Sequence, residues 1–363
     1  MNKFLSIVWY KVLPPVYGGQ KGIAHFNEHL ANRIALTCLC SKNNASREKL
    51  NYQIKAVLPT SKLQFWNPVV RSKILNEIKS QDYDHVIIEH PYHGWLGKHK
   101  MKLGFKFIVH AHNIEFTRMR SRGLWWWRII RAVERNAFRN ADHILFKTED
   151  DRKYAIEHFG IDIERALVVP YGINRTRDQP EAQAEVRSRH GIRQTEKIIL
   201  FAASFDYAPN IEAVGIVKNE LLPRLRKSRV PFKIVICGKM ASHLYPNEKE
   251  VIIAGEVNDV SAYMMAADVF INPVTKGSGI QTKNIDALSY GLPIVSTKFA
   301  AKGLPDYLIP QHLNIAENDD WQKFATLIIS ALEGKRMSEQ RFFQDYYWGN
   351  IVDRFVYHIT MKG

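Results

Sequence analysis

Short apolar segments alternate with amphipathic stretches along the whole chain. In the first half they lie near residues 4–12, 34–39, 53–58, 85–89, 106–111, 143–147 and 167–169. In the second half they lie near residues 197–202, 232–237, 251–254, 269–272 and 294–296. Strands that alternate with helices form parallel sheets covered by helices. The pattern therefore predicts an α/β protein with two Rossmann-like, doubly wound domains, each with its ligands at the carboxyl edge of its sheet.

A polar stretch separates the two series of strands. The segment 170–174 ends the first series, and a run of polar residues follows it. We predict one domain over 1–174, a linker over 175–195 and a second domain over 196–338, because the chain is too long for one small core. The last segment, 339–363, is rich in aromatic residues.

Composition restricts the class of protein. A hydrophobic content of 46% and a charged content of 24% are those of a soluble globular protein, and no apolar run is long enough to span a bilayer. Lys11 interrupts the first apolar run, so the start of the chain is interpreted as a strand rather than a signal peptide. Cys38, Cys40 and Cys237 offer neither a disulfide framework nor a four-ligand metal site. We expect the reducing cytoplasm.

The net charge is strongly positive, since 51 Lys and Arg against 36 Asp and Glu give +15. A basic surface favours anionic partners such as a nucleotide donor, an acidic membrane leaflet or nucleic acid. The sequence has no zinc-finger spacing, no aromatic RNA-binding motif and no basic zipper, so nucleic acid is not the favoured partner.

The segment 277–297 combines a glycine-rich turn, a short helix, a glycine stop and a buried strand. Gly277 and Gly279 allow the backbone to approach a ligand closely, and Ser278 is expected to cap the helix. The first turn of the helix, at Ile280 and Gln281, would offer unpaired N–H groups to an anion such as a diphosphate.

Two charged side chains follow on the same helix. Lys283 and Asp286 are three residues apart, so both project from one side of the helix. A cation for phosphate beside a carboxylate for sugar hydroxyls suits a nucleotide-sugar site. A helix terminus without a ligand is the alternative interpretation of the glycine-rich turn.

With these residues in register, the segment resembles the donor-site signature of the retaining family 4 glycosyltransferases of the GT-B fold. The similarity is to the branch that reads Gly-x-Gly-x-x-x-Lys-x-x-Glu-Ala. Most members carry two glutamates eight positions apart, where this chain has Ser278 and Asp286. The resemblance implies two domains facing across a cleft and a C-terminal helix over 339–363 that returns to the first domain. It also implies a diphosphate site without a metal or other cofactor.

The resemblance covers most of the chain and implies further donor contacts. Residues 201–210 are similar to a family loop near the donor phosphates, and residues 255–257 to a turn that holds the base through its backbone. The loop lacks the arginine and lysine of many relatives, so Lys283 would compensate the phosphate charge, with Lys276 as a possible helper. The implied donor contacts are Gly277, Ser278, Gly279, Ile280, Gln281, Lys283, Asp286, Ser204, Asp206, Asn210, Lys239 and Val257.

Two histidines of the first domain are candidates for a catalytic role. His110 and His112 end a strand two residues apart, so their side chains point to one face. The family often places a first-domain histidine beside the transferring sugar, which makes His112 the first catalytic candidate and His110 the second. The residues expected on the acceptor side of the cleft are Gly18, Gly19, His93, His110, Asn113 and Glu115. A purely structural role stays an alternative for these histidines.

Tryptophans and arginines gather over residues 118–131. Trp125, Trp126 and Arg128 suit a membrane interface, where rings lie at headgroup depth and guanidinium groups meet lipid phosphate. Three consecutive tryptophans spread over about 200° of a helix, so they cannot all share one narrow face. We predict peripheral contact with an anionic membrane, at the inner face of the plasma membrane; a partly solvated helix is the alternative.

These observations predict an enzyme, a retaining hexosyltransferase that moves a sugar from a nucleoside diphosphate sugar to an acceptor hydroxyl. Lys283 would stabilise the leaving diphosphate, Asp286 would hold the ribose and His112 would lie near the sugar. The expected acceptor is a glycan or a lipid-linked molecule in bacterial surface polysaccharide or glycolipid synthesis. Two alternatives stay open: a nucleotide-sugar epimerase or hydrolase of the same fold, and a basic nucleic-acid-binding protein.

Overall fold

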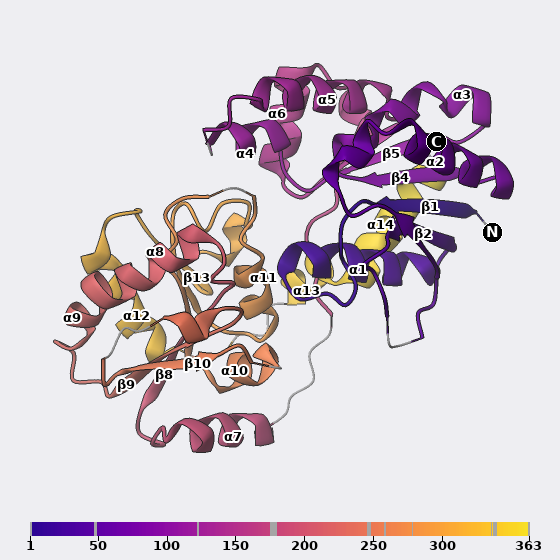
Figure 1. Ribbon diagram of the computed structural model, residues 1–363. Helices are drawn as coiled ribbons and strands as arrows, with labels where there is room; N and C mark the ends of the chain where they lie inside the picture. The colour runs from indigo at the N-terminus through magenta and orange to yellow at the C-terminus, as the bar shows by residue number, and fades with distance from the viewer. Residues whose placement is uncertain are drawn as a thin grey trace. The chain divides into compact units, whose positions relative to one another are not determined.

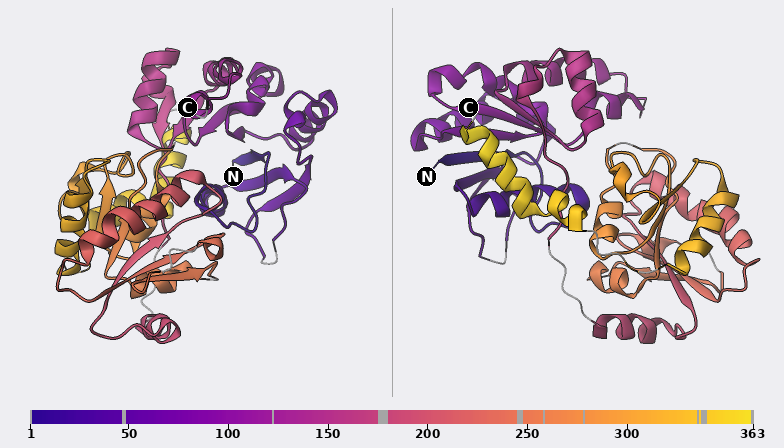
Figure 2. Two further views of the ribbon diagram at one scale, coloured as in Figure 1. Left: turned by 60° about the vertical axis from the view of Figure 1, so that its left-hand side comes forward. Right: turned by 180° about the vertical axis from the view of Figure 1, so that it is seen from behind.

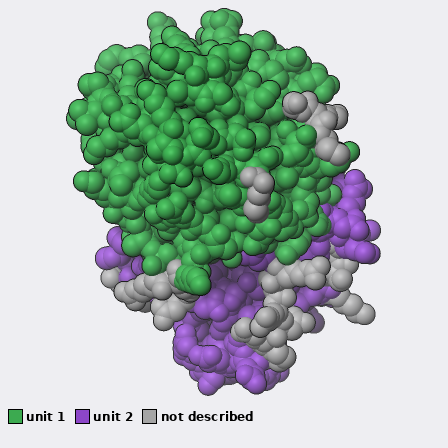
Figure 3. All heavy atoms as spheres, turned by 90° about the vertical axis from the view of Figure 1, so that its right-hand side faces the viewer, with its two compact units in different colours: residues 1–172, 345–363 green, residues 173–344 purple. Residues whose placement is uncertain are grey.

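The computed structural model describes residues 2–46, 49–121, 123–174, 180–244, 248–257, 259–277, 279–334, 336 and 340–361 (Figure 1). The chain divides into two compact units, which Figure 3 colours separately. Unit 1 comprises Met1–Gly172 and Asp345–Gly363, and unit 2 comprises Ile173–Gln344. Each unit is built around one parallel sheet.

Unit 1 contains a seven-stranded sheet with the order β3-β2-β1-β4-β5-β6-β7, in which all neighbours are parallel. The strands are β1 (Lys3–Val8), β2 (Ala35–Ser41), β3 (Gln53–Leu58), β4 (His85–Glu89), β5 (Lys106–Ala111), β6 (His143–Phe146) and β7 (Ala166–Val168). The helices are α1 (Gly18–Ala31), α2 (Pro68–Gln81), α3 (Lys100–Leu103), α4 (Glu115–Ser121), α5 (Trp127–Asn140) and α6 (Glu149–Phe159), with short 3₁₀ turns η1 (Lys62–Phe65), η2 (Pro91–Lys98) and η3 (Ile163–Arg165). The central strands are buried on both faces, which explains why they are apolar throughout.

Unit 2 contains a six-stranded parallel sheet with the order β10-β9-β8-β11-β12-β13. Its strands are β8 (Lys197–Ala202), β9 (Phe232–Cys237), β10 (Val251–Gly255), β11 (Val269–Asn272), β12 (Ile294–Thr297) and β13 (Leu313–Ala316). Its helices include α7 (Pro180–His190), α8 (Ala208–Ile216), α9 (Leu222–Leu225), α10 (Val260–Ala266), α11 (Thr282–Ser289) and α12 (Trp321–Leu332). Between α8 and α9 the helical path continues through a π-helical turn, η4 (Val217–Leu221).

Helix α7 lies inside the segment 175–195, which the sequence analysis treats as a linker. It belongs to unit 2 and packs against α10. Ala182 and Val186 are buried on its inner side. The ring nitrogen Nε2 of His190 lies 2.9 Å from the hydroxyl of Tyr263. A mostly polar sequence thus forms a helix because a few of its side chains pack on a neighbouring helix.

The C-terminal helix completes unit 1. After α13 (Gln340–Tyr346), α14 (Trp348–Met361) packs alongside α1, and is yellow in Figure 2. Trp348 is fully buried, and a Cβ on Gly172 would lie 2.4 Å from its ring, so only glycine fits there. Arg33 and Asp353 form an ion pair of 2.7 Å. The predicted fold, two Rossmann-like sheets with a returning C-terminal helix, is confirmed in these features.

Both sheets reverse their strand order at one point, between β1 and β4 in unit 1 and between β8 and β11 in unit 2. In open parallel sheets, ligands bind outside the carboxyl ends of the strands at such a switch point. The loops after β8 and β11 are therefore the first place to look for a ligand site in unit 2, and the ends of β1 and β4 in unit 1. Within the described part of the chain, no helix has the length and apolar character needed to cross a bilayer.

Candidate functional site

The loop after β8 and the start of α8 form one side of the switch point in unit 2. Ser204 donates a hydrogen bond from Oγ to Oδ1 of Asp206, at 2.7 Å. The buried Asn210, in the first turn of α8, donates from Nδ2 to the carbonyl oxygen of Ser204, also at 2.7 Å. These bonds hold the loop in a defined shape and leave the side-chain oxygen of Asn210 for another partner.

That partner is Lys283 on α11. Its Nζ donates to Oδ1 of Asn210 at 2.7 Å and lies 5.2 Å from the centre of the Phe201 ring. Burial lowers the pKa of Lys283 to about 7. The structure thus brings Lys283 and Asn210 into contact. Both are predicted donor contacts, and they follow β11 and β8, the strands on the two sides of the switch point. An anion placed here would favour the charged form of the lysine.

The other lysines near these loops have carboxylate partners. Lys239 pairs with Asp206 at 2.6 Å, and this bond lowers the pKa of Asp206. Lys276 pairs with Glu212 at 2.8 Å on the surface. Lys283 has no ion pair with any carboxylate among the described residues. It is therefore the cation of this site that is best placed to meet an incoming phosphate.

Helix α11 begins later than the sequence analysis predicts. Gly277 and Gly279 adopt positive φ angles of 139° and 72°, so the chain is still turning at these positions. The helix begins at Thr282 with Gln281 as its N-cap, and the side chain of Gln281 makes no cap hydrogen bond. Ser278, which the sequence analysis predicts as the cap, lies outside the described residues. The unpaired N–H groups of the first turn begin at Thr282 rather than at Gly279.

The remaining predicted donor contacts lie on α11, in the turn that precedes it, or in the turn after β10. Asp286 lies one turn after Lys283 on α11, and both side chains are half-buried. Ile280 and Gln281 are half-buried in the turn that leads into the helix. Val257 is half-buried in the turn after β10, close before Asp259, which caps α10 through the amide of Ser261.

Two buried asparagines that sequence reasoning missed hold α11 against the sheet. Asn272, the last residue of β11, donates from Nδ2 to Oδ1 of Asn284 at 2.9 Å. Asn284 donates from its own Nδ2 to the carbonyl oxygen of Ala300 at 2.8 Å. A polar residue that ends an otherwise apolar strand was the available signal for this contact. The pair fixes the helix that carries Lys283 and Asp286.

In unit 1, a carboxylate and two imidazoles meet at the ends of β4 and β5. Glu89 and His110 are direct partners in the strand register, and Nδ1 of His110 lies 3.0 Å from Oε2 of Glu89. Nε2 of His112 lies 2.6 Å from the same oxygen. Because an ionised carboxylate only accepts, both rings direct an N–H at it. The side chain of His112 keeps 11% of its surface exposed, whereas those of Glu89 and His110 have none. Of the three, His112 is thus the one able to touch a ligand.

The charges of this cluster are set by burial. Burial alone would raise the pKa of Glu89, but the two histidines hold it well below its usual range. Burial, together with His110 and His90, lowers the pKa of His112. Burial also lowers the pKa of the nearby Lys147 to about 8, although the charge of Glu89 raises it. At neutral pH the cluster therefore contains an ionised carboxylate between two neutral imidazoles.

The same cluster has the composition of a metal site. The ligand atoms of Glu89, His110 and His112 all lie within 4.8 Å of one another. The two N–H groups already satisfy the carboxylate, and the ammonium group of Lys147 contributes electrostatically to both Glu89 and His110. Nε2 of His110 and Nζ of Lys147 are buried without a hydrogen-bond partner among the described residues, so the carboxylate is paired but the cluster as a whole is not fully hydrogen-bonded.

Other residues predicted on the acceptor side hold the structure together. Glu115 is buried and bonded to Nδ1 of His90 at 3.1 Å and to the hydroxyl of Tyr92 at 2.9 Å. His93 is buried beside the ring of Phe65, and burial lowers its pKa to about 3. The expectation that these side chains line an open cleft is therefore corrected, because both point into the interior.

The small and polar residues of this group remain near the surface. Gly18 and Gly19 form the first turn of α1. Gly19 is exposed and Gly18 is half-buried. Asn113 is half-buried directly after His112. Their place on the acceptor side stays a prediction.

The consecutive tryptophans differ in their exposure to solvent. Trp125 is 81% exposed and Arg128 is exposed, as expected of residues at an interface. Trp126 is half-buried and packs against the core of unit 1 with Trp127. Trp126 therefore contributes to the fold rather than to the surface. The three tryptophans do not share a helix, because α5 begins at Trp127 and the other two lie in the turn before it.

Each half of the chain matches the model of a known protein family. Residues 16–177 match the model of the Glycosyltransferase Family 4, and residues 196–334 match the model of the glycosyl transferases of group 1. A D-inositol 3-phosphate glycosyltransferase of Geodermatophilus obscurus is 31% identical over 45% of this chain and 39% of its own length. The alpha-monoglucosyldiacylglycerol synthase of Streptococcus pneumoniae is 24% identical over 46% of this chain and 40% of its own. The chain thus spans about two fifths of the length of these curated relatives.

A solved structure is similar over the full length. HepE of Anabaena, in complex with UDP, superposes with a TM-score of 0.77 over 99% of this chain and 100% of that chain, at 14% identity. At this identity the likeness shows the fold, which is GT-B. Since the two family matches cover the sheets of both units, the chain belongs to the family 4 (group 1) glycosyltransferases.

Proposed function

We propose that this protein transfers a sugar from a nucleoside diphosphate sugar to an acceptor hydroxyl, with retention at the anomeric carbon. The observation that carries the proposal is Lys283, which is half-buried at the switch point of unit 2, has no carboxylate partner among the described residues and donates to Asn210. A diphosphate is a ligand that such a cation and the first turn of α11 would bind together. UDP in the complex of HepE from Anabaena, which has the same fold, supports this class of donor.

The proposed mechanism rests on fixed charges. As the bond to the sugar breaks, negative charge develops on the leaving diphosphate, and Lys283 with the N–H groups at Thr282 would stabilise it. Asp286 would accept hydrogen bonds from the ribose hydroxyls. The loop at Ser204 and Asn210 would hold the phosphates from the other side, and Val257 would contact the base through its backbone.

We infer that His112 is the residue of unit 1 that lies nearest to the transferring sugar. Glu89 would act as a positioning residue, since its carboxylate holds the ring of His112 by a bond of 2.6 Å. His110 would support the same carboxylate from the interior. No part of this proposal requires a metal or another cofactor.

For the acceptor we propose a glycan or a lipid-linked molecule of bacterial surface polysaccharide or glycolipid synthesis. The support is the similarity to a monoglucosyldiacylglycerol synthase, whose name refers to a lipid product. We place the protein in the cytoplasm, at the inner face of the plasma membrane. A donor made in the cytoplasm and an acceptor anchored in the membrane would meet there.

The test is calorimetric binding of UDP, GDP, ADP and dTDP to the wild type and to a Lys283→Ala, Asp286→Ala double variant. We expect one diphosphate to bind well and the double variant to lose it. The matched control is Lys298→Ala with Glu317→Ala, an exposed pair at 2.9 Å, which removes one cation and one carboxylate from the surface of the same unit. Binding of none of the four, or equal binding by the double variant, would contradict the proposed donor site.

A second measurement separates transfer from the reactions of an epimerase or hydrolase. The sugar form of the diphosphate that binds is incubated with and without a mixture of lipid and glycan acceptors. Turnover of the donor that depends on acceptor supports transfer. Equal turnover without acceptor would assign the site to hydrolysis or epimerisation instead.

A further inference from the structure

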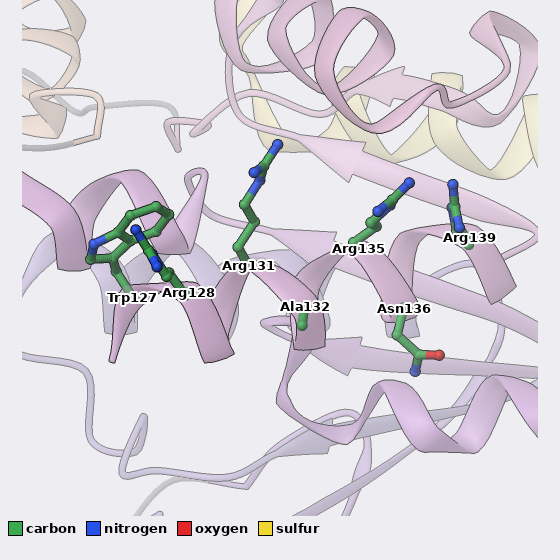
Figure 4. Close-up of a pocket in the computed structure, with 7 residues that line it drawn as sticks. All are labelled: Trp127, Arg128, Arg131, Ala132, Arg135, Asn136 and Arg139. Atoms are coloured by element: carbon green, nitrogen blue, oxygen red, sulfur yellow. The ribbon is translucent and has the colours of Figure 1, made fainter. Parts of the chain in front are cut away.

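A row of arginines on α5 has no role in the proposed reaction. Arg128, Arg131, Arg135 and Arg139 are all exposed. With Trp127, Ala132 and Asn136 they line a hollow of about 640 Å³. In Figure 4 the side chains of Arg131, Arg135 and Arg139 rise from one side of the helix, and Arg128 lies beside Trp127. The row occurs at intervals of three or four residues, so its members share one face of the helix.

The charge of this arginine row is not balanced within the protein. None of the four guanidinium groups forms an ion pair with a carboxylate among the residues that the structure describes. Two of them are held by rings instead. Arg128 lies 5.4 Å from the centre of Trp127, and Arg131 lies 5.5 Å from that of Phe116. Like charges one turn apart repel each other. An anion that binds along the row relieves this repulsion, so its binding is favourable.

Apolar side chains project from the same part of the chain. Trp125, just before α5, is 81% exposed, and Ile129 within it is 51% exposed. A soluble phosphate group would not cover these side chains. Large apolar side chains exposed together indicate a surface that is covered by a partner. A lipid headgroup layer offers phosphate to the arginines and partial burial to the tryptophan and the isoleucine.

The dimensions of the arginine row favour a surface over a small ligand. From Arg128 to Arg139 the helix rises about 16 Å, which exceeds the size of a single phosphate or diphosphate group. The four side chains are exposed and lie along an open hollow rather than converging on one point. A row of this kind suits several phosphate groups in one plane.

We propose that the arginine row of α5, with Trp125 and Ile129, binds the phosphate headgroups of an anionic membrane surface. This assigns the membrane contact to the exposed side of α5 and the turn before it, instead of to the tryptophan run as a whole. It deepens the proposed function by naming the surface that would bring the enzyme to a membrane-anchored acceptor. Because binding to vesicles requires no sugar transfer, failure of this inference and failure of the proposed reaction are distinguishable.

The test is co-sedimentation of the full chain with vesicles of phosphatidylcholine alone and of phosphatidylcholine mixed with phosphatidylglycerol. We expect binding to the mixed vesicles that weakens with added salt. The variant Arg135→Gln, Arg139→Gln should bind them about 30-fold more weakly, from the usual contribution of two arginines near an anionic surface. Neither side chain forms a hydrogen bond or an ion pair with the residues that the structure describes, and equal thermal unfolding temperatures would verify that the variant is folded.

The matched control is Lys227→Gln with Arg229→Gln, which removes the same charge from exposed positions of unit 2. It should bind the vesicles as the wild type does. Absence of binding to the mixed vesicles at low salt, or equal loss in both variants, would overturn the proposal. Pyrophosphate or a short oligonucleotide that binds through Arg135 and Arg139, without vesicle binding, would also overturn it and assign the row to a soluble anion or to nucleic acid.

Discussion

At the scale of single residues, the protonation of Lys283 links donor binding to pH. Burial lowers its pKa to about 7 in the free protein, and a bound diphosphate would raise it by stabilising the charged form. Above pH 7 the free protein therefore contains mostly the neutral amine and must take up a proton to bind. We expect the Kd for the diphosphate to rise with pH between 7 and 9, by at most about tenfold per pH unit.

Calorimetry in two buffers with different ionisation enthalpies measures this proton uptake directly. The uptake should be largest above pH 7 and disappear in Lys283→Ala. A Kd that is constant from pH 7 to 9 in the wild type would show that Lys283 is already charged before the ligand binds.

Glu89 gives a second prediction at this scale, since its carboxylate holds His112. The carboxylate raises the pKa values of His110 and His112, although burial lowers both overall. In Glu89→Gln we expect the pKa of His112 to fall further, because the neutral amide removes the favourable charge. We also expect kcat to fall roughly tenfold or more, by analogy with other carboxylates that orient a histidine.

Histidine ring resonances followed by NMR through a pH titration report the first effect, and the transfer assay reports the second. The matched control is Glu77→Gln, a carboxylate of unit 1 that pairs with Lys55 at 2.7 Å, away from this cluster. If Glu89→Gln left both the titration of His112 and kcat unchanged, the carboxylate would have only a packing role.

At the scale of elements, the position of α11 depends on a buried amide pair. Asn284→Ala would leave Nδ2 of Asn272 and the carbonyl oxygen of Ala300 without partners in the interior. Each such group costs about 1–3 kcal/mol of stability. We expect unit 2 to unfold at lower urea concentration and the diphosphate to bind more weakly, because the helix that carries Lys283 loses its attachment.

Asn314→Ala serves as the comparison, because the side chain of this half-buried asparagine makes one long bond, of 3.4 Å, to the carbonyl of Ile294 among the described residues. It should change stability and binding little. Wild-type stability and wild-type binding in Asn284→Ala would show that α11 is positioned by its apolar face alone.

The elements also show what the sequence could and could not predict. The apolar runs locate twelve of the strands, because most of them are buried on both faces and therefore apolar throughout; β3, β7 and β10 are only partly buried but still apolar enough to be found. The exception is β13, a short edge strand whose Asn314 and Ile315 are half-buried and whose sequence lacks a clear pattern. The start of α11 was placed too early, because spacing alone does not reveal that Gly279 has a positive φ.

Within the site, side chains on one element were easier to predict than pairs between elements. Lys283 and Asp286 follow from helical spacing. The pair of Asn272 with Asn284 joins two elements, so it depends on how they pack. Glu89 and His110 meet because β4 and β5 pair in one particular register, which the sequence does not specify. Burial of His93 and Glu115 follows from tertiary packing for the same reason.

At the scale of the whole molecule, the two units are built differently along the chain. Unit 2 is one continuous segment, Ile173–Gln344, whereas unit 1 needs the C-terminal segment that begins at Asp345. Trp348 of that segment is fully buried against Gly172. Replacing it by alanine should therefore destabilise unit 1, by about 3–5 kcal/mol for a large buried aromatic side chain. The donor site proposed here lies entirely within unit 2, on α11, the start of α8 and the loops beside them.

These facts predict that two perturbations act on different units. In scanning calorimetry, Trp348→Ala should lower the transition of unit 1. A diphosphate at about 100 times its Kd should stabilise unit 2 by about 2.7 kcal/mol and leave the transition of unit 1 in place. If both changes moved a single transition, the units would unfold as one cooperative body, and binding energy from the donor site would then stabilise the histidine cluster of unit 1 as well.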